Sequence, residues 1–270
     1  SQPALNPFHR FNKAVLMYCD GASFSGHVEE PISFGGKRLY FRGRQVLASL
    51  IRALLKMGLA EAQQVLLTGL SAGGLAAILQ GDHVQSLLPP SVERFKVISF
   101  AGWFRSDKAA CRDAAECPWM EAMRKAQSLH DMRGSLDARE TDCLRKNGWA
   151  CIHARYAAPR SKAPLFLVES SLDSWQLSNI WRGPKGANDE HGCVGSHFAN
   201  CTAKELGQLD GDVAPTFRSP RLDPPTTLSS VISAPSEPKA PRVAAAFGTD
   251  LVSEISENLL TRPGNGAFIT

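Results

Sequence analysis

Hydrophobic residues in the first part of the chain form a short apolar run followed by a helical pattern. Residues 14–18 are a continuous apolar run, which is typical of a strand buried on both faces. From Val46 to Met57 the apolar residues recur at steps of three and four, and Gly58 follows where a helix usually ends. This pattern predicts a buried strand and then an amphipathic helix.

The same alternation continues through the middle of the chain. Residues 65–68 predict a strand, and a turn containing glycine leads from it into a helix made of the small-residue run 72–79. Residues 95–100 and 164–168 predict two further strands, with a helical pattern at 119–129 between them. Strands separated by helix-length segments form parallel βαβ units. The sequence therefore predicts an α/β fold with a doubly wound, mostly parallel sheet and a site at the carboxyl ends of its strands.

The composition changes after about Leu209. Seven prolines between positions 215 and 241 interrupt a stretch rich in serine, threonine and alanine. Such a stretch cannot bury enough apolar surface to offset its ordering entropy. We therefore expect one domain, residues 1–209, and a disordered segment, residues 210–270, with a short isolated helix at 251–260.

Composition and charge limit the classes of function. With 43% hydrophobic and 21% charged residues among 270, the chain can bury one sizeable core. The formal net charge of +4 favours a polyanionic partner such as a uronic-acid polymer only weakly. Because no stripe of Lys and Arg is interleaved with aromatic residues, we do not expect nucleic-acid binding. No apolar run reaches about 18 residues, so we expect no membrane association.

Seven cysteines without CxxC spacing favour disulfides in an oxidising compartment over a zinc site. Reduced, buried cysteines in a cytosolic protein are the alternative. The number is odd, so one thiol is free, pairs with another chain, or lacks its partner. The cysteines are Cys19, Cys111, Cys117, Cys143, Cys151, Cys193 and Cys201. We predict no metal and no cofactor.

The main chemical signal is a G-x-S-x-G motif at residues 69–73, between the strand 65–68 and the helix of small residues. In a nucleophile elbow the serine occupies a strained turn, and the flanking glycines avoid collisions of a Cβ with the neighbouring strand and helix. Ser71 is then the nucleophile, and the backbone N–H of Ala72 donates to the developing oxyanion, aided by the positive end of the helix. A purely structural glycine turn is the alternative.

A serine nucleophile needs a histidine base and a carboxylate that orients the histidine. In folds of this class the chain order is serine, acid, histidine. Asp173 follows the strand 164–168 and stands where a triad acid belongs. An aspartate that caps a helix or closes a turn is the alternative.

Four segments, in this order and rough spacing, resemble the hallmarks of the pectin acetylesterase family. They are Tyr18-Cys19-Asp20-Gly21-Ala22-Ser23-Phe24-Ser25-Gly26, Phe41-Arg42-Gly43, Leu70-Ser71-Ala72-Gly73-Gly74-Leu75-Ala76 and Asp173-Ser174-Trp175-Gln176. The resemblance covers roughly residues 7–205. It implies an α/β-hydrolase fold, secretion to the extracellular space or cell wall, and hydrolysis of acetyl esters in pectin by a protein that we expect to be a monomer.

The resemblance carries the nucleophile onto Ser71, the oxyanion N–H onto Ala72 and the triad acid onto Asp173. Family members also have, before the position of Tyr18, a glycine-rich segment that supplies further oxyanion donors. This chain lacks that segment, so we expect an esterase domain truncated at its amino end. The catalytic histidine of the family lies in a cysteine-rich segment downstream of Asp173, where this chain has no histidine after His197.

The catalytic histidine is therefore unassigned. His191 and His197 follow Asp173 in the correct chain order but stand where the family has no catalytic residue. The remaining candidates are expected to be surface or packing residues, and they are His27, His83, His130 and His153.

Two further hypotheses accompany the pectin acetylesterase prediction. One is an inactive, truncated relative or a carbohydrate-binding pseudoenzyme. The other is a carboxylesterase like Notum, a relative of the family, which acts on a fatty-acyl ester of a protein. Trp103, which follows the strand 95–100, either shapes the substrate pocket or is a buried core residue.

Overall fold

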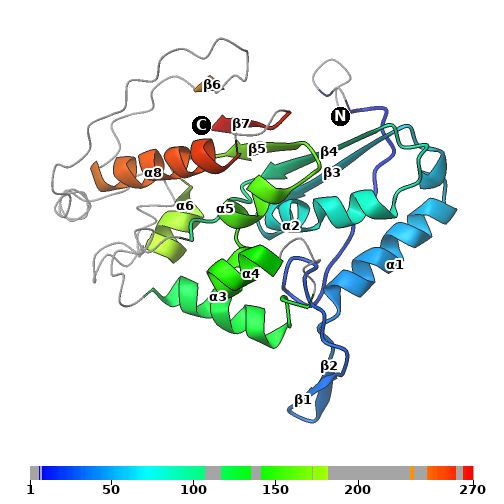
Figure 1. The fold of residues 1–270 in the computed structure, drawn as a ribbon, viewed down its shortest axis with the longest axis horizontal. Helices are drawn as coiled ribbons and strands as arrows, with labels where there is room; N and C mark the ends of the chain where they lie inside the picture. The colour runs from blue at the N-terminus through cyan, green and yellow to red at the C-terminus, as the bar shows by residue number, and fades with distance from the viewer. Residues whose placement is uncertain are drawn as a thin grey trace.

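The computed structural model describes residue 6 and residues 8–106, 117–134, 141–171, 173–181, 232–233, 242–259 and 264–269. In this part of the chain, five strands form one sheet in the order β3-β4-β5-β7-β6, and every neighbouring pair is parallel. Helices flank the sheet (Figure 1). This arrangement confirms the predicted α/β fold.

Three of the predicted strands are neighbours in the sheet. They are β3 (Gln64–Leu70), β4 (Arg94–Phe100) and β5 (Leu165–Glu169). Their register places Leu70 beside Phe100 and Phe100 beside Val168. The three strands therefore end at one edge of the sheet, and the residues that follow them are brought together there.

The helices agree with the predicted pattern in the first half of the chain. The α-helices are α1 (Gly43–Lys56), α2 (Ala72–Leu87), α3 (Pro118–Leu129), α4 (Thr141–Asn147), α5 (Ala154–Ala157), α6 (Ser174–Gln176) and α8 (Arg242–Leu259). Shorter turns of helix are η1 (Leu59–Glu61), η4 (Gly148–Ile152), η5 (Ala158–Arg160) and the π-helical η6 (Leu177–Trp181).

Helix α2 lies at the centre of the fold, packed on β3 and β4 and against α1 and α5 (Figure 1). Its small residues permit this close packing. A Cβ on Gly74 would lie 2.6 Å from the carbonyl oxygen of Phe100, and Ala76 and Ala77 are buried in the core. Helix α1 is amphipathic as predicted, because Leu47 and Ile51 are buried.

The strand predicted at residues 14–18 is absent. The side chains of this segment alternate between the core and solvent. Val15 and Met17 are 83% and 73% exposed, whereas Leu16 and Tyr18 pack against the core. Within the described residues no strand pairs with the segment, so one face of the apolar run remains in solvent.

The end of the chain also differs from the prediction. Residues 242–259 form α8, with Leu251, Ile255 and Leu259 fully buried in the main core. Strand β7 (Gly266–Ile269) pairs with β5, and β6 (Ile232–Ser233) pairs with β7. A disordered segment 210–270 is therefore wrong for these residues, because apolar positions four apart give α8 a buried stripe. Residues 210–231 lie outside the described part.

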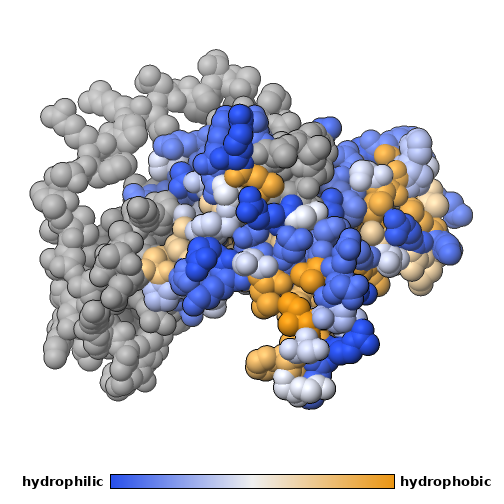
Figure 2. Space-filling view, turned by 60° about the horizontal axis from the view of Figure 1, so that its bottom comes forward, coloured by the Kyte–Doolittle hydropathy of each residue, from blue (hydrophilic) through white to orange (hydrophobic). Residues whose placement is uncertain are grey.

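A hairpin projects from the body of the protein (Figures 1 and 2). Strands β1 (Ile32–Phe34) and β2 (Lys37–Leu39) are antiparallel, and Gly35 and Gly36 form the turn between them. Both glycines have positive φ angles, +55° and +74°, which fits the tight turns favoured in two-residue hairpins.

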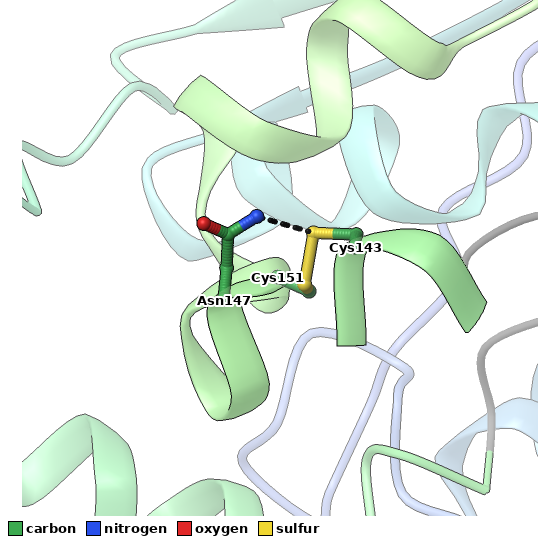
Figure 3. The surroundings of a disulfide bond; sticks show 3 residues. All are labelled: Cys143, Asn147 and Cys151. Atoms are coloured by element: carbon green, nitrogen blue, oxygen red, sulfur yellow. Dashed lines mark hydrogen bonds between the residues drawn. A yellow bond between two sulfur atoms is a disulfide. The ribbon is translucent and has the colours of Figure 1, made fainter. Parts of the chain in front are cut away.

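One disulfide joins Cys143 in α4 to Cys151 in η4 (Figure 3). Asn147, between them, donates from Nδ2 to Cys143 Sγ at 3.6 Å. Cys117 is also disulfide-bonded, and Cys19 is a free, exposed thiol. The predicted disulfides are thus present. Among the described helices, none is both long and apolar enough to cross a membrane.

Candidate active site

Ser71 occupies a strained turn between the end of β3 and the start of α2. Its backbone angles are φ +57° and ψ −121°, which a residue with a Cβ rarely adopts. Its N–H donates to the carbonyl of Phe100 at 2.8 Å, and its own carbonyl accepts from Leu75 N at 3.0 Å. The residue is exposed to solvent. Such strain costs about 1–3 kcal/mol and clusters at functional sites.

The glycines around Ser71 have different roles. A Cβ on Gly69 would lie 2.1 Å from the carbonyl oxygen of Gly73, so position 69 requires glycine. A Cβ on Gly73 would meet nothing within 4 Å. The sequence prediction that both glycines avoid collisions is therefore wrong for Gly73. Gly74, outside the five-residue motif, is the second position that requires glycine, because of its contact with β4.

Ala72 is the first residue of α2, directly after Ser71. Backbone N–H groups in the first turn of a helix have no partner within the helix, and the helix dipole is positive there. Helix α2 has no acidic residue in its first turn to neutralise this end. The hydroxyl of Ser23 donates to the carbonyl oxygen of Ala72 at 3.0 Å. The start of α2 is thus electrostatically suited to an anion beside Ser71.

Asp173 lies at the same edge of the sheet as Ser71, just beyond the end of β5. One carboxylate oxygen, Oδ1, accepts the backbone N–H of Gln176 at 2.7 Å and caps α6. Asp173 therefore caps a helix, as the alternative interpretation of the sequence proposed. The cap fixes the side chain and engages Oδ1, one of its two oxygens. Strand β4 stands between the strands that carry Ser71 and Asp173.

Glu169 is a residue that the sequence analysis did not single out. It ends β5 and is 2% exposed. Its pKa is raised to about 8, mainly by burial and to a smaller extent by the charge of Asp173, while backbone N–H donors from Trp103 and Gly102 act in the opposite direction. In the sequence, this residue could have been noticed as a carboxyl group directly after the apolar run 164–168. At neutral pH this group is mostly uncharged.

The turn after β4 is held by a polar network. The indole of Trp103 is completely buried and donates to Glu254 Oε1 at 3.0 Å. Gln176 donates from Nε2 to the carbonyl of Trp103, and accepts the N–H of Arg105, both at 3.0 Å. Trp103 is therefore a core residue, and of its two sequence interpretations the pocket-lining one is wrong. Through α6 and α8 the network fixes the loop beside Asp173.

Three aromatic rings pack together beside Asp173. The ring centroids of Phe104, Trp119 and Trp175 are 5.4–5.6 Å apart in each pair. Phe104 is buried, whereas Trp175, which is part of α6, is 45% exposed. These rings give the carboxyl edge of the sheet an apolar surface next to the capped carboxylate.

Several histidines are packing residues, as predicted. His153 is completely buried, and burial, with a contribution from the charge of Arg155, lowers its pKa to about 4. His130 is 5% exposed, and burial lowers its pKa. His27 contacts Gln45 Nε2 at 3.1 Å. In the described part of the chain, none of the three hydrogen-bonds to Ser71 or Asp173.

The two histidines that follow Asp173 in the required order, His191 and His197, lie outside the described residues. The catalytic base that Ser71 would need is therefore not placed by the structure. His83, in α2, has a backbone carbonyl that accepts from Ser86 Oγ at 2.7 Å.

Comparison with solved structures supports the fold. Notum from Drosophila, described as a Wnt deacylase, matches 93% of this chain and 57% of its own with a TM-score of 0.60. The sequence identity is 20%, so this likeness concerns the fold alone.

Curated relatives are similar at the level of sequence. Pectin acetylesterase 5 of Arabidopsis thaliana is 34% identical over 183 residues, which are 67% of this chain and 41% of the relative. The palmitoleoyl-protein carboxylesterase NOTUM of Mus musculus is 31% identical over 192 residues, 66% of this chain and 36% of the relative. The chain thus spans less than half the length of these relatives.

The match to a family model is more extensive than either pairwise similarity. The pectinacetylesterase model matches residues 1–215, which include the strained Ser71, the capping Asp173 and all four of the motifs noted in the sequence. With this match and the Arabidopsis similarity, the chain belongs to the pectinacetylesterase family.

Proposed function

We propose that the protein is a secreted carboxylic ester hydrolase that removes acetyl groups from pectin, with Ser71 as nucleophile. The observation that carries the proposal is the exposed Ser71 held at φ +57° at the start of α2. A serine in an ordinary turn gains nothing from this strain, whereas an elbow presents its hydroxyl to a substrate.

The reaction follows acyl-enzyme chemistry. Ser71 Oγ forms a bond to the acetyl carbonyl carbon while a base takes its proton, and the sugar hydroxyl leaves with a proton. Water then attacks the acetyl-serine ester, and acetate is released. The Ala72 N–H and the positive end of α2 stabilise the negative charge that develops on the carbonyl oxygen in both steps.

Asp173 is the proposed orienting acid for that base. The α6 cap holds Oδ1, and this fixes the direction of the carboxylate. The uncharged state of neighbouring Glu169 at neutral pH removes a negative charge that would compete with Asp173 for the base. The base itself remains unassigned among the residues described.

Pectin is proposed as substrate because relatives named pectin acetylesterases match at 32–34% identity, against 26–31% for relatives named Notum carboxylesterases. The disulfide Cys143–Cys151 supports the proposed location in the extracellular space or cell wall.

A fluorophosphonate probe on the full-length protein tests the nucleophile. We expect labelling of the wild type, loss of labelling in Ser71→Ala, and unchanged labelling in Ser49→Ala, an exposed serine on α1 whose hydroxyl donates to the carbonyl of Gln45. Labelling that persists in Ser71→Ala would show that another residue reacts.

An acyl-length series separates the proposed function from its alternatives. Acetate release from acetylated homogalacturonan, with 4-nitrophenyl acetate preferred over 4-nitrophenyl octanoate, is the expected result. A preference for octanoate favours the fatty-acyl alternative. Removal of a triad residue costs on the order of 10⁶ in turnover, so rates near background on every ester favour the inactive relative.

A further inference from the structure

The family motif at residues 18–26 has no role in the chemistry described so far, yet part of it lies buried against the nucleophile turn. Ser23 and Phe24 are each 6% exposed. Both have positive φ angles, +51° and +56°. Two consecutive residues with side chains in this region are rare, and such strain persists only where the surroundings over-determine the backbone.

Contacts with the start of α1 hold this loop in place. Asp20 Oδ2 accepts the N–H of Gly43 at 2.6 Å, and the carbonyl of Gly26 accepts the N–H of Arg44 at 3.0 Å. A Cβ on Gly43 would lie 2.9 Å from the Cα of Phe24, so α1 begins in direct contact with the loop. The start of α1 therefore holds the loop independently of its contact with α2.

One side chain of the loop reaches the candidate active site. Ser23 Oγ donates to the carbonyl oxygen of Ala72 at 3.0 Å, across 49 positions of sequence. The carbonyl of Ser71, on the other side of Ala72, accepts from Leu75 N at 3.0 Å. Both peptide groups that flank Ala72 are thus anchored, and together they set the direction in which its N–H points.

We propose that Ser23 is a positioning residue for the oxyanion donor, acting through its hydrogen bond to the Ala72 carbonyl. The inference rests on the proposed function, because it assigns Ser23 to the same site. Ser23 touches no reacting atom. An oxyanion donor works only when it lies about 2.7–3.1 Å from the developing oxyanion, and a shift of about 1 Å costs on the order of 10² in rate.

Loss of this hydrogen bond should slow acylation without weakening substrate binding. In Ser23→Ala the Ala72 carbonyl loses the donor from the loop, so the first turn of α2 is no longer tied to residues 18–26. We expect kcat for 4-nitrophenyl acetate and the rate of fluorophosphonate labelling to fall about tenfold or more, with KM changed less than twofold. Ser23→Gly relieves the strain at φ +51° but also lacks the hydroxyl, so it should be as slow as Ser23→Ala.

Ser25→Ala is the matched control. Ser25 lies in the same loop and is 2% exposed. It accepts from Gln80 Nε2 at 2.8 Å and donates to the carbonyl of Ser23 at 3.4 Å, and within the described residues it has no hydrogen bond to Ala72. Both alanine variants remove one buried hydroxyl from the loop, so both should lower Tm by a few degrees. Only the Ser23 variants should slow labelling.

Three results overturn the inference. If Ser23→Ala keeps the labelling rate and the kcat of the wild type, the Ser23 hydroxyl does not position the oxyanion donor. Equal slowing in Ser25→Ala, or wild-type rates in Ser23→Gly, shows that loop stability or backbone strain is responsible. In these cases the proposed function stands. No labelling of Ser71 in the wild type overturns the proposed function and this inference together.

Discussion

The backbone N–H of Trp103 donates to Glu169 Oε2 at 3.1 Å in the interior, where the carboxyl is 2% exposed. The other oxygen, Oε1, has no hydrogen-bond partner among the described residues. Backbone N–H donors do not fully compensate an ionised carboxylate for the loss of water, and this is why the pKa rises to about 8. Glu169 therefore makes the stability of the protein depend on pH.

Replacement of Glu169 by Gln should remove part of that pH dependence. The folded pKa lies above the ordinary value of 4.5, so the neutral form stabilises the fold fully below about pH 4.5, and this contribution declines as pH rises toward 8. The full effect is about 4–5 kcal/mol. We expect the free energy of unfolding of the wild type to fall, relative to Glu169→Gln, between pH 5 and 9 in urea titrations.

The difference between the two proteins is the relevant measurement, because other groups titrate equally in both. A constant difference across this range would mean that Glu169 is ionised in the folded protein. The matched control is Glu61→Gln, which removes an exposed carboxyl in η1 instead of a buried one.

His153 should make the protein less stable as pH falls, which is the opposite of the dependence expected from Glu169. Both ring nitrogens lack partners in the described structure, and the pKa is lowered to about 4 from 6.5. The stabilising contribution of the neutral ring is therefore present above pH 6.5 and is lost as pH falls toward 4, by about 3 kcal/mol in full. His153→Phe, which keeps a ring against Trp149, should show a smaller loss of Tm between pH 7 and 4 than the wild type.

The contradicting outcome for His153 is an equal loss of Tm in both proteins. That result would place the ring in contact with water or a donor in solution. Nuclear magnetic resonance titration of the ring provides a second readout, in which the signal should not shift above about pH 5.

The strained turn at Ser71 could be predicted from sequence because its causes are local. A strand, a strained serine and a helix of small residues stand within one short segment around Ser71. The protonation state of Glu169 could not be predicted, because it depends on Trp103, 66 positions away, and on the burial that β4 provides. The strand β7 was missed for the same reason, since its pairing with β5 joins segments about 100 positions apart.

Removal of the disulfide should destabilise the protein moderately. The bond closes a loop of 8 positions between Cys143 and Cys151. For a loop this short, the chain-entropy estimate is about 2–3 kcal/mol. The double variant Cys143→Ala, Cys151→Ala should show a lower urea midpoint than the wild type. An unchanged midpoint, with the bond verified by mass spectrometry in the wild type, would show that the loop is held by packing alone.

The two glycines that follow Ala72 should respond oppositely to alanine. In Gly74→Ala the new Cβ would lie 2.6 Å from the Phe100 carbonyl oxygen and 2.9 Å from Gly102 Cα, both backbone atoms that cannot move aside without separating α2 from β4. We expect a loss of several kcal/mol, as in other overpacked cores, and loss of labelling at Ser71. Gly73→Ala meets nothing within 4 Å, and alanine in a helix is favoured over glycine by about 1 kcal/mol, so Tm should be unchanged or higher. Thermal melts of the two variants test the geometry directly, because the five-residue motif alone would predict that Gly73 is the intolerant position. A Gly73→Ala protein that melts as early as Gly74→Ala would contradict the packing described for the start of α2.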